Sequence, residues 1–247
     1  MEHGAPCTPC EWAALADRDL RAIRMIVSFI AAGLSFGVFR YIYHDYLAMA
    51  PELGQNPRCR IPLDACTPEF GSRVVSSLHC VTAVTLAVLY LAGLVSEGYW
   101  LLCLNISVGY LVHDLLLVST EARVRNVNDV IHHVAFITVI TFADSYPYQM
   151  ARGILAETSL PFLYAGWAML RLQLTHSYKK TFWTCSVVGV LLFFIFRVVN
   201  FTQLVYYSYY HASMLVTCAG GALAGLNYYW FAKLVKIALK VPSPCPG

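Results

Sequence analysis

Long apolar stretches dominate this chain and limit what it can fold into. Seven hydrophobic blocks, separated by short polar connections, account for most of the sequence. They span residues 25–43, 74–95, 100–118, 131–142, 154–170, 183–206 and 212–238. Because about 20 apolar helical residues cross the roughly 30 Å hydrocarbon core of a bilayer, most of these blocks are long enough to span a membrane. The pattern predicts a polytopic membrane protein.

The continuous character of the blocks favours helices over a β-barrel. Backbone polar groups in lipid must be bonded within the protein, and barrel strands would appear as short alternating segments. Only 13% of the residues are charged, whereas a soluble domain has about 25%. We therefore expect an all-α, polytopic membrane helical bundle of about seven transmembrane helices. The fourth block, 131–142, is short, so it could tilt, break or continue over residues 128–146.

The distribution of Lys and Arg predicts how the chain crosses the membrane. With seven spans, most of these residues lie at block ends on the same side as the C-terminus. Basic residues near span ends concentrate on the cytosolic side, which places the C-terminus inside and the N-terminus outside. Arg18, Arg21 and Arg24 lie on the other side and argue against this orientation. Residues 1–24 lack an apolar core, so we expect an N-terminal tail rather than a cleaved signal peptide.

Charge and glycine spacing bear on the partners of the chain. The net charge is only +3, and without a basic stripe or a binding motif we expect no nucleic-acid partner. Gly221 and Gly225 have the GxxxG spacing that allows two helices to approach closely. We interpret this pair as packing within the bundle, so the sequence supports no oligomer.

Ionisable side chains inside the apolar blocks are the clearest functional signal. His132 and His133 are adjacent at the start of the fourth block, and Asp129 precedes them by three and four residues. On a helix, this spacing brings the carboxylate alongside both rings. An ionisable group at membrane depth is costly, and such groups usually face the bundle interior or a wet cavity. The pair therefore marks a candidate site.

Further polar residues within the blocks extend this candidate site. They are His79, Tyr110, His113, Asp114, Arg152, Glu157, Arg197 and Asn200. Taken singly, each could stabilise helix packing through interhelical hydrogen bonds. The number of ionisable groups that share one bundle instead favours a polar, lipid-accessible cavity.

The spacing of the histidine pair favours acid–base chemistry over metal binding. Adjacent helical residues point about 100° apart, so His132 and His133 cannot readily chelate one metal as an i, i+4 pair would. We predict no metal site and no cofactor. One ring could abstract a proton or be acylated while the other stabilises developing charge, with Asp129 as the orienting group. A purely structural histidine cluster is the alternative.

An ordered series of segments gives the chain a resemblance to a known family. The segments are "GSRVVSSLH", "GYLVHDLLL", "IHHVAFITVI", "ARGILAETSLPFLYAGW" and "FFIFRVVN". Together they resemble the TLC-domain family, which is related to ceramide synthases, and most of all its TLC-domain-containing subfamily. The resemblance implies a six-helix TLC core plus one N-terminal helix, a central lipid cavity, and residence in the endoplasmic reticulum or connected endomembranes.

The resemblance also divides the chain. It implies an N-terminal tail at 1–24, a first transmembrane helix and loop at 25–69, a TLC-type transmembrane domain at 70–240, and a C-terminal tail at 241–247. His132 and His133 match the catalytic pair of ceramide synthases. The His-Asp…Asp cluster that follows in those enzymes is absent, and Glu157 with a "SLPF" run occupies its region. The subfamily implies a role in membrane lipid composition and homeostasis, with sphingolipids such as ceramide as candidates.

These observations favour three functions over a fourth. The main hypothesis is a protein of membrane lipid homeostasis with a lipid- or acyl-binding cavity around the His-His pair. An acyl-CoA-dependent N-acyltransferase acting on a sphingoid base, and a non-enzymatic lipid-binding or cargo-sorting protein, are alternatives. A receptor or transporter is less favoured because no repeated halves are present.

Each candidate residue has an expected role. The catalytic candidates are His132, His133, Asp129, Asp114 and Glu157. The substrate-binding candidates are His113, Tyr110, His79, Arg152, Arg197 and Asn200. Arg197 could hold an anionic group, since guanidinium binds phosphates and oxyanions well. Membrane lipids are the expected partners, and acyl-CoA would be a substrate rather than a cofactor.

Overall fold

The architecture is helical throughout the part of the chain that the structure describes. The computed structural model describes residues 9–42, 63–122, 124–143, 145–172 and 174–240, with side chains described for all of these except 9–21, 63–68 and 238–240. Its elements are α1 (Pro9–Arg40), α3 (Leu63–Leu91), α4 (Glu97–Thr120), α5 (Val127–Phe142), α6 (Pro147–Ile154), η2 (Leu155–Ser159), α7 (Leu160–Arg171), α8 (Lys179–Leu192), η3 (Phe193–Asn200), α9 (Phe201–His211) and α10 (Met214–Lys240).

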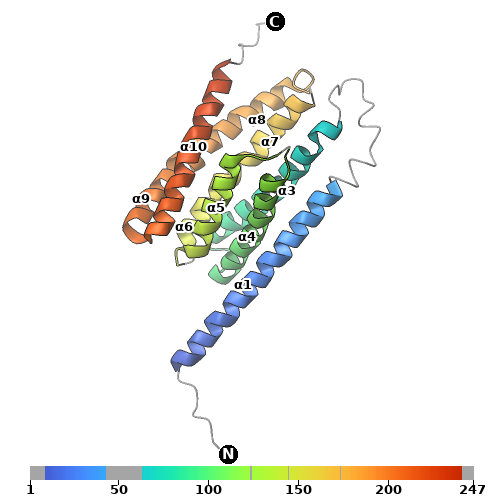
Figure 1. Cartoon of the computed structure of the whole chain (residues 1–247). Coiled ribbons are helices and arrows are strands. Elements are labelled where there is room, and N and C mark those ends of the chain that lie inside the picture. Colours follow the sequence, from blue (N-terminus) through green and yellow to red (C-terminus); the bar gives the residue numbers. More distant parts are fainter. Residues whose placement is uncertain (1–8, 43–62, 123, 144, 173, 241–247) are drawn as a thin grey trace, which may run out of the picture.

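These elements form seven passes through one bundle. Helices α1, α3, α4 and α5 are the first four, and α10 is the last. The fifth pass combines α6, η2 and α7, and the sixth combines α8, η3 and α9. As Figure 1 shows, α1 begins and α10 ends at opposite ends of the bundle. The predicted all-α membrane bundle is confirmed.

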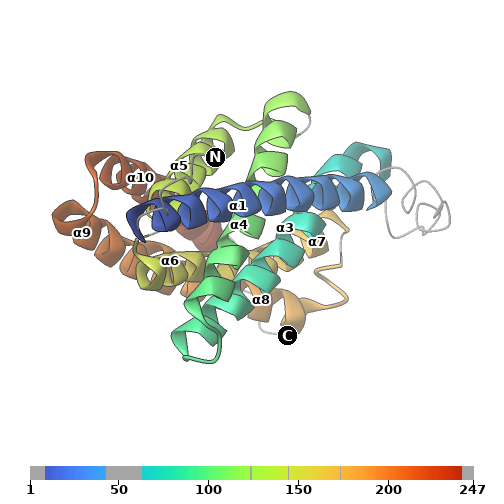
Figure 2. The same ribbon diagram turned by 90° about the horizontal axis from the view of Figure 1, so that it is seen from below.

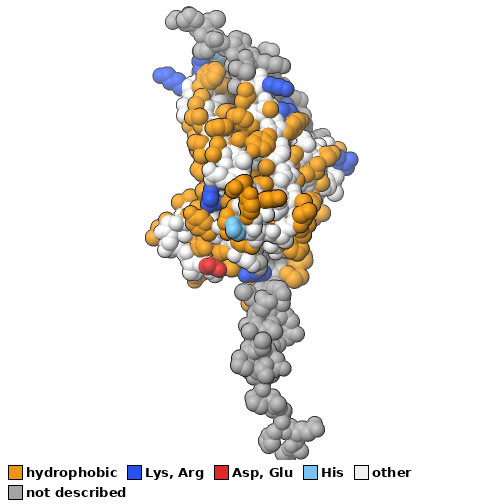
Figure 3. Space-filling view, turned by 90° about the vertical axis from the view of Figure 1, so that its left-hand side faces the viewer, with side chains coloured by type: hydrophobic (Ala, Val, Ile, Leu, Met, Phe, Trp, Pro, Cys, Tyr) orange, Lys and Arg blue, Asp and Glu red, His pale blue; other side chains and the backbone are white. Residues whose placement is uncertain are grey.

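Among the described residues, four helical segments are long and apolar enough to cross a bilayer unaided. They are Ala22–Arg40, Glu69–Leu91, Glu97–Thr120 and Lys179–His211, and Val127–Phe142 is a shorter apolar helix. Large hydrophobic side chains such as Phe29 and Leu94 are 73% exposed. Hydrophobic side chains also cover most of the face in Figure 3, with few charged ones among them. Such a surface suits lipid rather than water.

Helix α1 starts earlier than the sequence suggested and lies across the bundle. It begins at Pro9, well inside the segment expected to be a tail. Figure 2 shows it crossing α4 and α3, and contacts with both helices bear this out. At Gly109 of α4, an added Cβ would lie 2.2 Å from the carbonyl oxygen of Ser28. Only glycine permits this approach, and the Ser28 hydroxyl then donates to the carbonyl of Asn105 at 2.9 Å.

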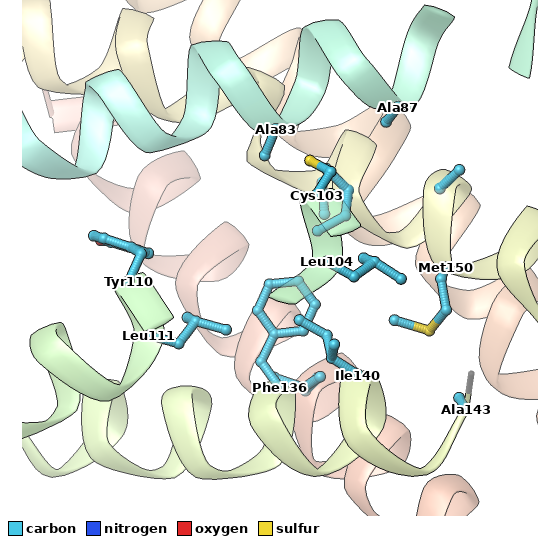
Figure 4. Close-up of a cluster of buried hydrophobic side chains, with 14 of the residues drawn as sticks. Ala83, Ala87, Cys103, Leu104, Tyr110, Leu111, Phe136, Ile140, Ala143 and Met150 are labelled. Atoms are coloured by element: carbon cyan, nitrogen blue, oxygen red, sulfur yellow. The ribbon is translucent and has the colours of Figure 1, made fainter. Parts of the chain in front are cut away.

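The hydrophobic core lies where α3, α4, α5 and α6 meet. Figure 4 shows Ala83 of α3, Leu104 of α4, Phe136 of α5 and Met150 of α6 converging there. The small side chain of Ala83 allows α4 to approach α3, and the larger residues fill the space between helices. This close-packed centre holds α4 and α5 side by side, which matters for the site below.

Proline chemistry breaks the fifth pass near its middle. Pro161 is within the first turn of α7 and cannot donate a backbone hydrogen bond to residue 157. The preceding residues adopt a 3₁₀ helix, in which the N–H of Leu160 bonds to the carbonyl of Glu157. Beside this turn, the carbonyl of Ala156 accepts from Nε of Arg197 at 2.8 Å. The sixth pass contributes Arg197 from a π-helical segment, a distortion often found at functional sites.

One expectation about glycine packing is wrong, and the bounds of two passes differ from those expected from the sequence. Gly221 and Gly225 were expected to pack within the bundle, but nothing lies within 4 Å of an added Cβ at either residue. That expectation is wrong, because both glycines are on the outward face of α10. The fifth pass starts at Pro147 rather than near residue 154, and the short fourth pass spans 16 residues.

Candidate functional site

A polar cavity of about 590 Å³ lies inside the bundle. Side chains of α3, α4, α5, α7 and α10 line it, together with residues of η2 and η3. The predicted site residues among them are His79, Tyr110, Asp114, Asp129, His132, His133, Glu157 and Arg197. We call this space the polar cavity. The structure thus brings eight of the eleven candidates to one cavity.

His133 joins α5 to α4 through a shared proton. Its Nε2 lies 2.9 Å from Oδ2 of Asp114, and its Nδ1 contacts the backbone carbonyl of Asp129 one turn earlier. A carbonyl only accepts hydrogen bonds, so Nδ1 carries a hydrogen. The contact between Nε2 and Asp114 then requires another proton, held by the ring or by the carboxyl group. The hydroxyl of Ser72 completes the site by donating to Oδ1 of Asp114 at 3.4 Å.

Asp129 orients the histidine pair in a different way from the one the sequence suggested. Its carboxylate accepts from the side-chain amide of Asn126 at 3.1 Å, near the start of α5. The contact with His133 comes instead from its backbone carbonyl. The carboxylate that pairs with the ring belongs to Asp114 of the neighbouring helix. Spacing within one helix could not reveal this, because the pairing depends on how α4 and α5 pack.

His132 occupies the cavity without a protein partner for its buried nitrogen. Its Nδ1 makes no hydrogen bond with any described residue. The ring lies edge-on to His133 and to Trp230, with centroids 5.4 Å apart in both cases. An unpaired buried polar atom costs about 1–3 kcal/mol, so the arrangement suits a group that finds its partner in a bound molecule.

Arg197 and Glu157 form a second ionic cluster in the cavity wall. Nη2 of Arg197 lies 2.9 Å from Oε1 of Glu157, and both side chains are nearly inaccessible to solvent. Nη1 of Arg197 donates to Oδ1 of Asn227 at 3.5 Å. The Cys80 thiol donates to Oε2 of Glu157 at 3.5 Å. Because protein groups already neutralise Arg197, its use as an anion-binding residue would require this pair to open.

His79 and Tyr110 form a stacked pair on another wall. Their ring centroids are 4.0 Å apart with nearly parallel planes. Nε2 of His79 and the hydroxyl of Ser107 are 3.0 Å apart. The two rings are therefore held in place by α3 and α4 together.

Three candidates lie away from the polar cavity. His113 is buried beside α1, near the rings of Phe36 and Phe39. Arg152 donates to the side-chain oxygen of Asn200 at 2.8 Å, and the Asn200 amide donates back to the Arg152 carbonyl at 2.9 Å. This exchange joins α6 to η3. The structure thus places these side chains at helix contacts rather than at the cavity.

The polar cavity also contains residues that the sequence analysis did not single out. The guanidinium of Arg73 lies 4.9 Å from the Tyr164 ring centroid and 4.2 Å from that of Trp167, and it pairs with Glu69 at 3.7 Å. Trp230 contacts both His132 and Arg197. Aromatic residues are common at membrane interfaces and in apolar cores, so their presence in the sequence did not mark these roles. An arginine at the start of an apolar block, as in "GSRVV", was the available signal.

The cavity extends towards the end of the bundle where α10 ends. It reaches the connection between α4 and α5, where Arg125 lines it, and the last turns of α10, where Lys233 does. Both side chains are exposed. This is the end predicted to be cytosolic. Within the described ranges, no three His, Cys, Asp or Glu side chains are grouped to hold a metal ion.

Comparison with known proteins places this geometry in a family. Residues 69–236 match the family model described as TLC domain, which is more than half of the 247 residues. The chain belongs to the TLC-domain family. No curated protein and no solved structure matches it. The match starts in α3 and ends in α10, so α1 lies outside it.

Family membership and helix composition together identify a multi-pass membrane protein of the TLC-domain family. The resemblance drawn from the five sequence segments is thereby confirmed at the level of the family. All of the polar cavity that the structure describes lies within the matched residues.

Proposed function

We propose that this TLC-family protein binds a membrane lipid, or its acyl group, in the polar cavity and thereby acts in membrane lipid composition and homeostasis. The endoplasmic reticulum and connected endomembranes are the proposed location, with sphingolipids such as ceramide among the candidate lipids. The volume of about 590 Å³ is in the range of about 300–1,000 Å³ that is common for small-molecule sites.

The observation that carries this proposal is the unpaired Nδ1 of His132 beside the Asp114–His133 pair. Three polar groups thus meet in one cavity of the helical bundle, and one of them has an unmet hydrogen bond. A lipid amide, hydroxyl or ester group could supply that bond. Phe136, Leu160 and Leu163 contribute apolar lining to the same cavity, which suits an amphiphilic ligand.

Lipid retention tests the proposal. The protein would be purified in mild detergent, and the lipids that remain bound would be identified by mass spectrometry. We expect wild type to retain one lipid class above the bulk membrane composition, and the double variant His132→Ala, His133→Ala to lose it.

A matched control separates this effect from general damage. His176 and His211 are exposed and lie outside the polar cavity, so the double variant His176→Ala, His211→Ala should retain the same lipid as wild type. If the cavity variant keeps an unchanged lipid complement while remaining folded, the proposed function is wrong.

Acyl transfer is the second candidate, favoured by the position of His132. Its ring is next to a proton-sharing pair, as a general base or an acyl acceptor would require. In the proposed step, an amine-bearing lipid such as a sphingoid base attacks the thioester carbonyl of acyl-CoA. A C–N bond forms, the C–S bond breaks, and the amine proton passes through His132 to the departing thiolate. An acyl-imidazole on His132 would be the intermediate if transfer occurs in two steps.

Intact-protein mass spectrometry after incubation with acyl-CoA distinguishes these candidates. A covalent acyl adduct in wild type that is absent from His132→Ala supports a two-step acyltransferase. Amide product formed without an adduct supports direct transfer with His132 as the base. Lipid that is released on denaturation, with neither adduct nor product, supports a non-enzymatic lipid-binding role.

A further inference from the structure

A second cavity of about 360 Å³ lies between α1, α3 and α4. It is bounded by residues 27–38 of α1, 75–83 of α3 and 103–110 of α4. We call it the lateral groove. Most of its lining is aliphatic, contributed by side chains such as Ile30, Leu34 and Leu78.

The lateral groove lies at the outer surface of the bundle. Only 6% of the α1 span is buried, and Leu34 and Leu78, which line the groove, are 66% and 56% exposed. Large apolar side chains that are exposed on a membrane-spanning helix face lipid chains. An apolar space of this kind does not attract water, because water needs two or more polar partners.

The lateral groove and the polar cavity share a wall. His79 and Tyr110 line both spaces, and they are the stacked pair described above. On one side of the two rings are aliphatic residues of α1 and α3. On the other side are Asp114 and the histidine pair. Polar and apolar compartments are therefore contiguous, with an amphipathic boundary of two rings between them.

We propose that the lateral groove holds a hydrocarbon tail of the membrane lipid whose polar end occupies the polar cavity. The proposal rests on the proposed function and adds where the tail lies. In a membrane lipid, a polar end is joined to an apolar tail. With the polar end in the polar cavity and the tail in the lateral groove, this junction would lie at His79 and Tyr110. This boundary is also suitable for the linking group, because Nδ1 of His79 has no hydrogen-bond partner in the described part of the chain.

Helix α1 forms one side of the proposed tail site. It lies outside the residues that match the family model, yet it forms one side of the lateral groove. The close contact at Gly109 fixes its distance from α4. The added helix thereby limits the space that the groove offers to a tail.

A pair of threonines on α3 provides a matched test. Thr82 lines the lateral groove, whereas Thr85 does not, and both are exposed on the same helix. Thr82→Trp places an indole in the groove, and Thr85→Trp places one on the outer surface. Lipids that remain bound to each purified variant would be separated by mass according to chain length. We expect Thr82→Trp to shift the bound lipids to shorter tails, and Thr85→Trp to match wild type.

A second pair approaches the groove from α1. Ser35 lines it, and Gly37 faces open space on the same helix. Ser35→Trp should produce the same shift to shorter tails as Thr82→Trp, with Gly37→Trp as its control. Because the two test positions lie on different helices, a shift shared by both cannot come from one misfolded segment.

The outcomes separate this inference from the function on which it rests. In one outcome, wild type retains a lipid and the histidine variant loses it, but both groove variants keep the wild-type distribution of tail lengths. The tail then lies elsewhere, so the inference is overturned while the proposed function stands. If wild type retains no enriched lipid, both fail together. A shift to shorter tails in Thr82→Trp and Ser35→Trp alone supports the inference.

Discussion

Two ionic clusters share the polar cavity and differ in how completely they are bonded. Arg197 and Glu157 have side chains that are 3% and 7% exposed, and those of His133 and Asp114 are 8% and 10% exposed. Burial therefore does not distinguish them. Arg197 finds acceptors for all three of its nitrogens in Glu157, Ala156 and Asn227. His132, beside the second cluster, keeps an unpaired Nδ1.

The difference indicates what each cluster does. A fully bonded pair that ties η2 to η3 stabilises the fold. The buried nitrogen beside the histidine cluster has no described partner and faces a cavity, so it is available to hydrogen-bond a ligand there. We therefore assign the arginine cluster to structure and the histidine cluster to function.

Removing Arg197 should have the largest effect on stability. Arg197→Ala leaves Glu157 charged and buried, and breaking a buried ion pair costs about 3–5 kcal/mol. Unfolding of the purified protein by increasing SDS would measure this loss against wild type.

A double variant sharpens this prediction. Arg197→Met with Glu157→Leu removes both charges and keeps apolar volume, so it should be more stable than Arg197→Ala alone. If Arg197→Ala unfolds at the wild-type SDS concentration but loses bound lipid, the arginine cluster belongs to the ligand site and our assignment is reversed.

Changing Asp114 should have an intermediate effect on stability and a large one on function. Asp114→Asn keeps the shape but removes the charge that pairs with His133, and hydrogen bonds to charged groups contribute about 1.5–3 kcal/mol. Lipid retention should fall as well, because the proton-sharing pair is lost. Both quantities can be measured on one preparation.

Asp129→Asn is the control for this change. Its carboxylate bonds to Asn126 and not to the ring, so the backbone contact with His133 should persist. Equal losses for Asp114→Asn and Asp129→Asn would show that the carboxylate of Asp129, as first inferred from spacing, also orients the histidines.

Replacing His132 should have the smallest effect on stability. His132→Phe keeps the ring beside Trp230 and removes a nitrogen that bonds to no described residue. We expect a change of less than about 1.5 kcal/mol, together with loss of lipid retention or of the acyl adduct. A strongly destabilised His132→Phe would instead indicate that His132 is structural, which was the alternative considered for the pair.

The class of fold and the set of candidate residues could both be predicted from the sequence. Apolar blocks of membrane length permit few structures, because backbone hydrogen bonds must close within each span. For the same reason, ionisable residues within the blocks had to face inward, and eight of the eleven candidates line one cavity. These conclusions need only local composition and helical periodicity.

Tertiary packing selected which residues pair. The carboxylate of Asp114 reaches His133 from a different helix, and Arg152 with Asn200 forms a helix contact away from the cavity. It also placed Gly221 and Gly225 on the outer face, against expectation. Helical periodicity defines which face a residue occupies, but not which helix lies opposite that face. Pairing across helices depends on the packing of side chains such as Ala83 and Phe136, and that packing involves the whole bundle at once.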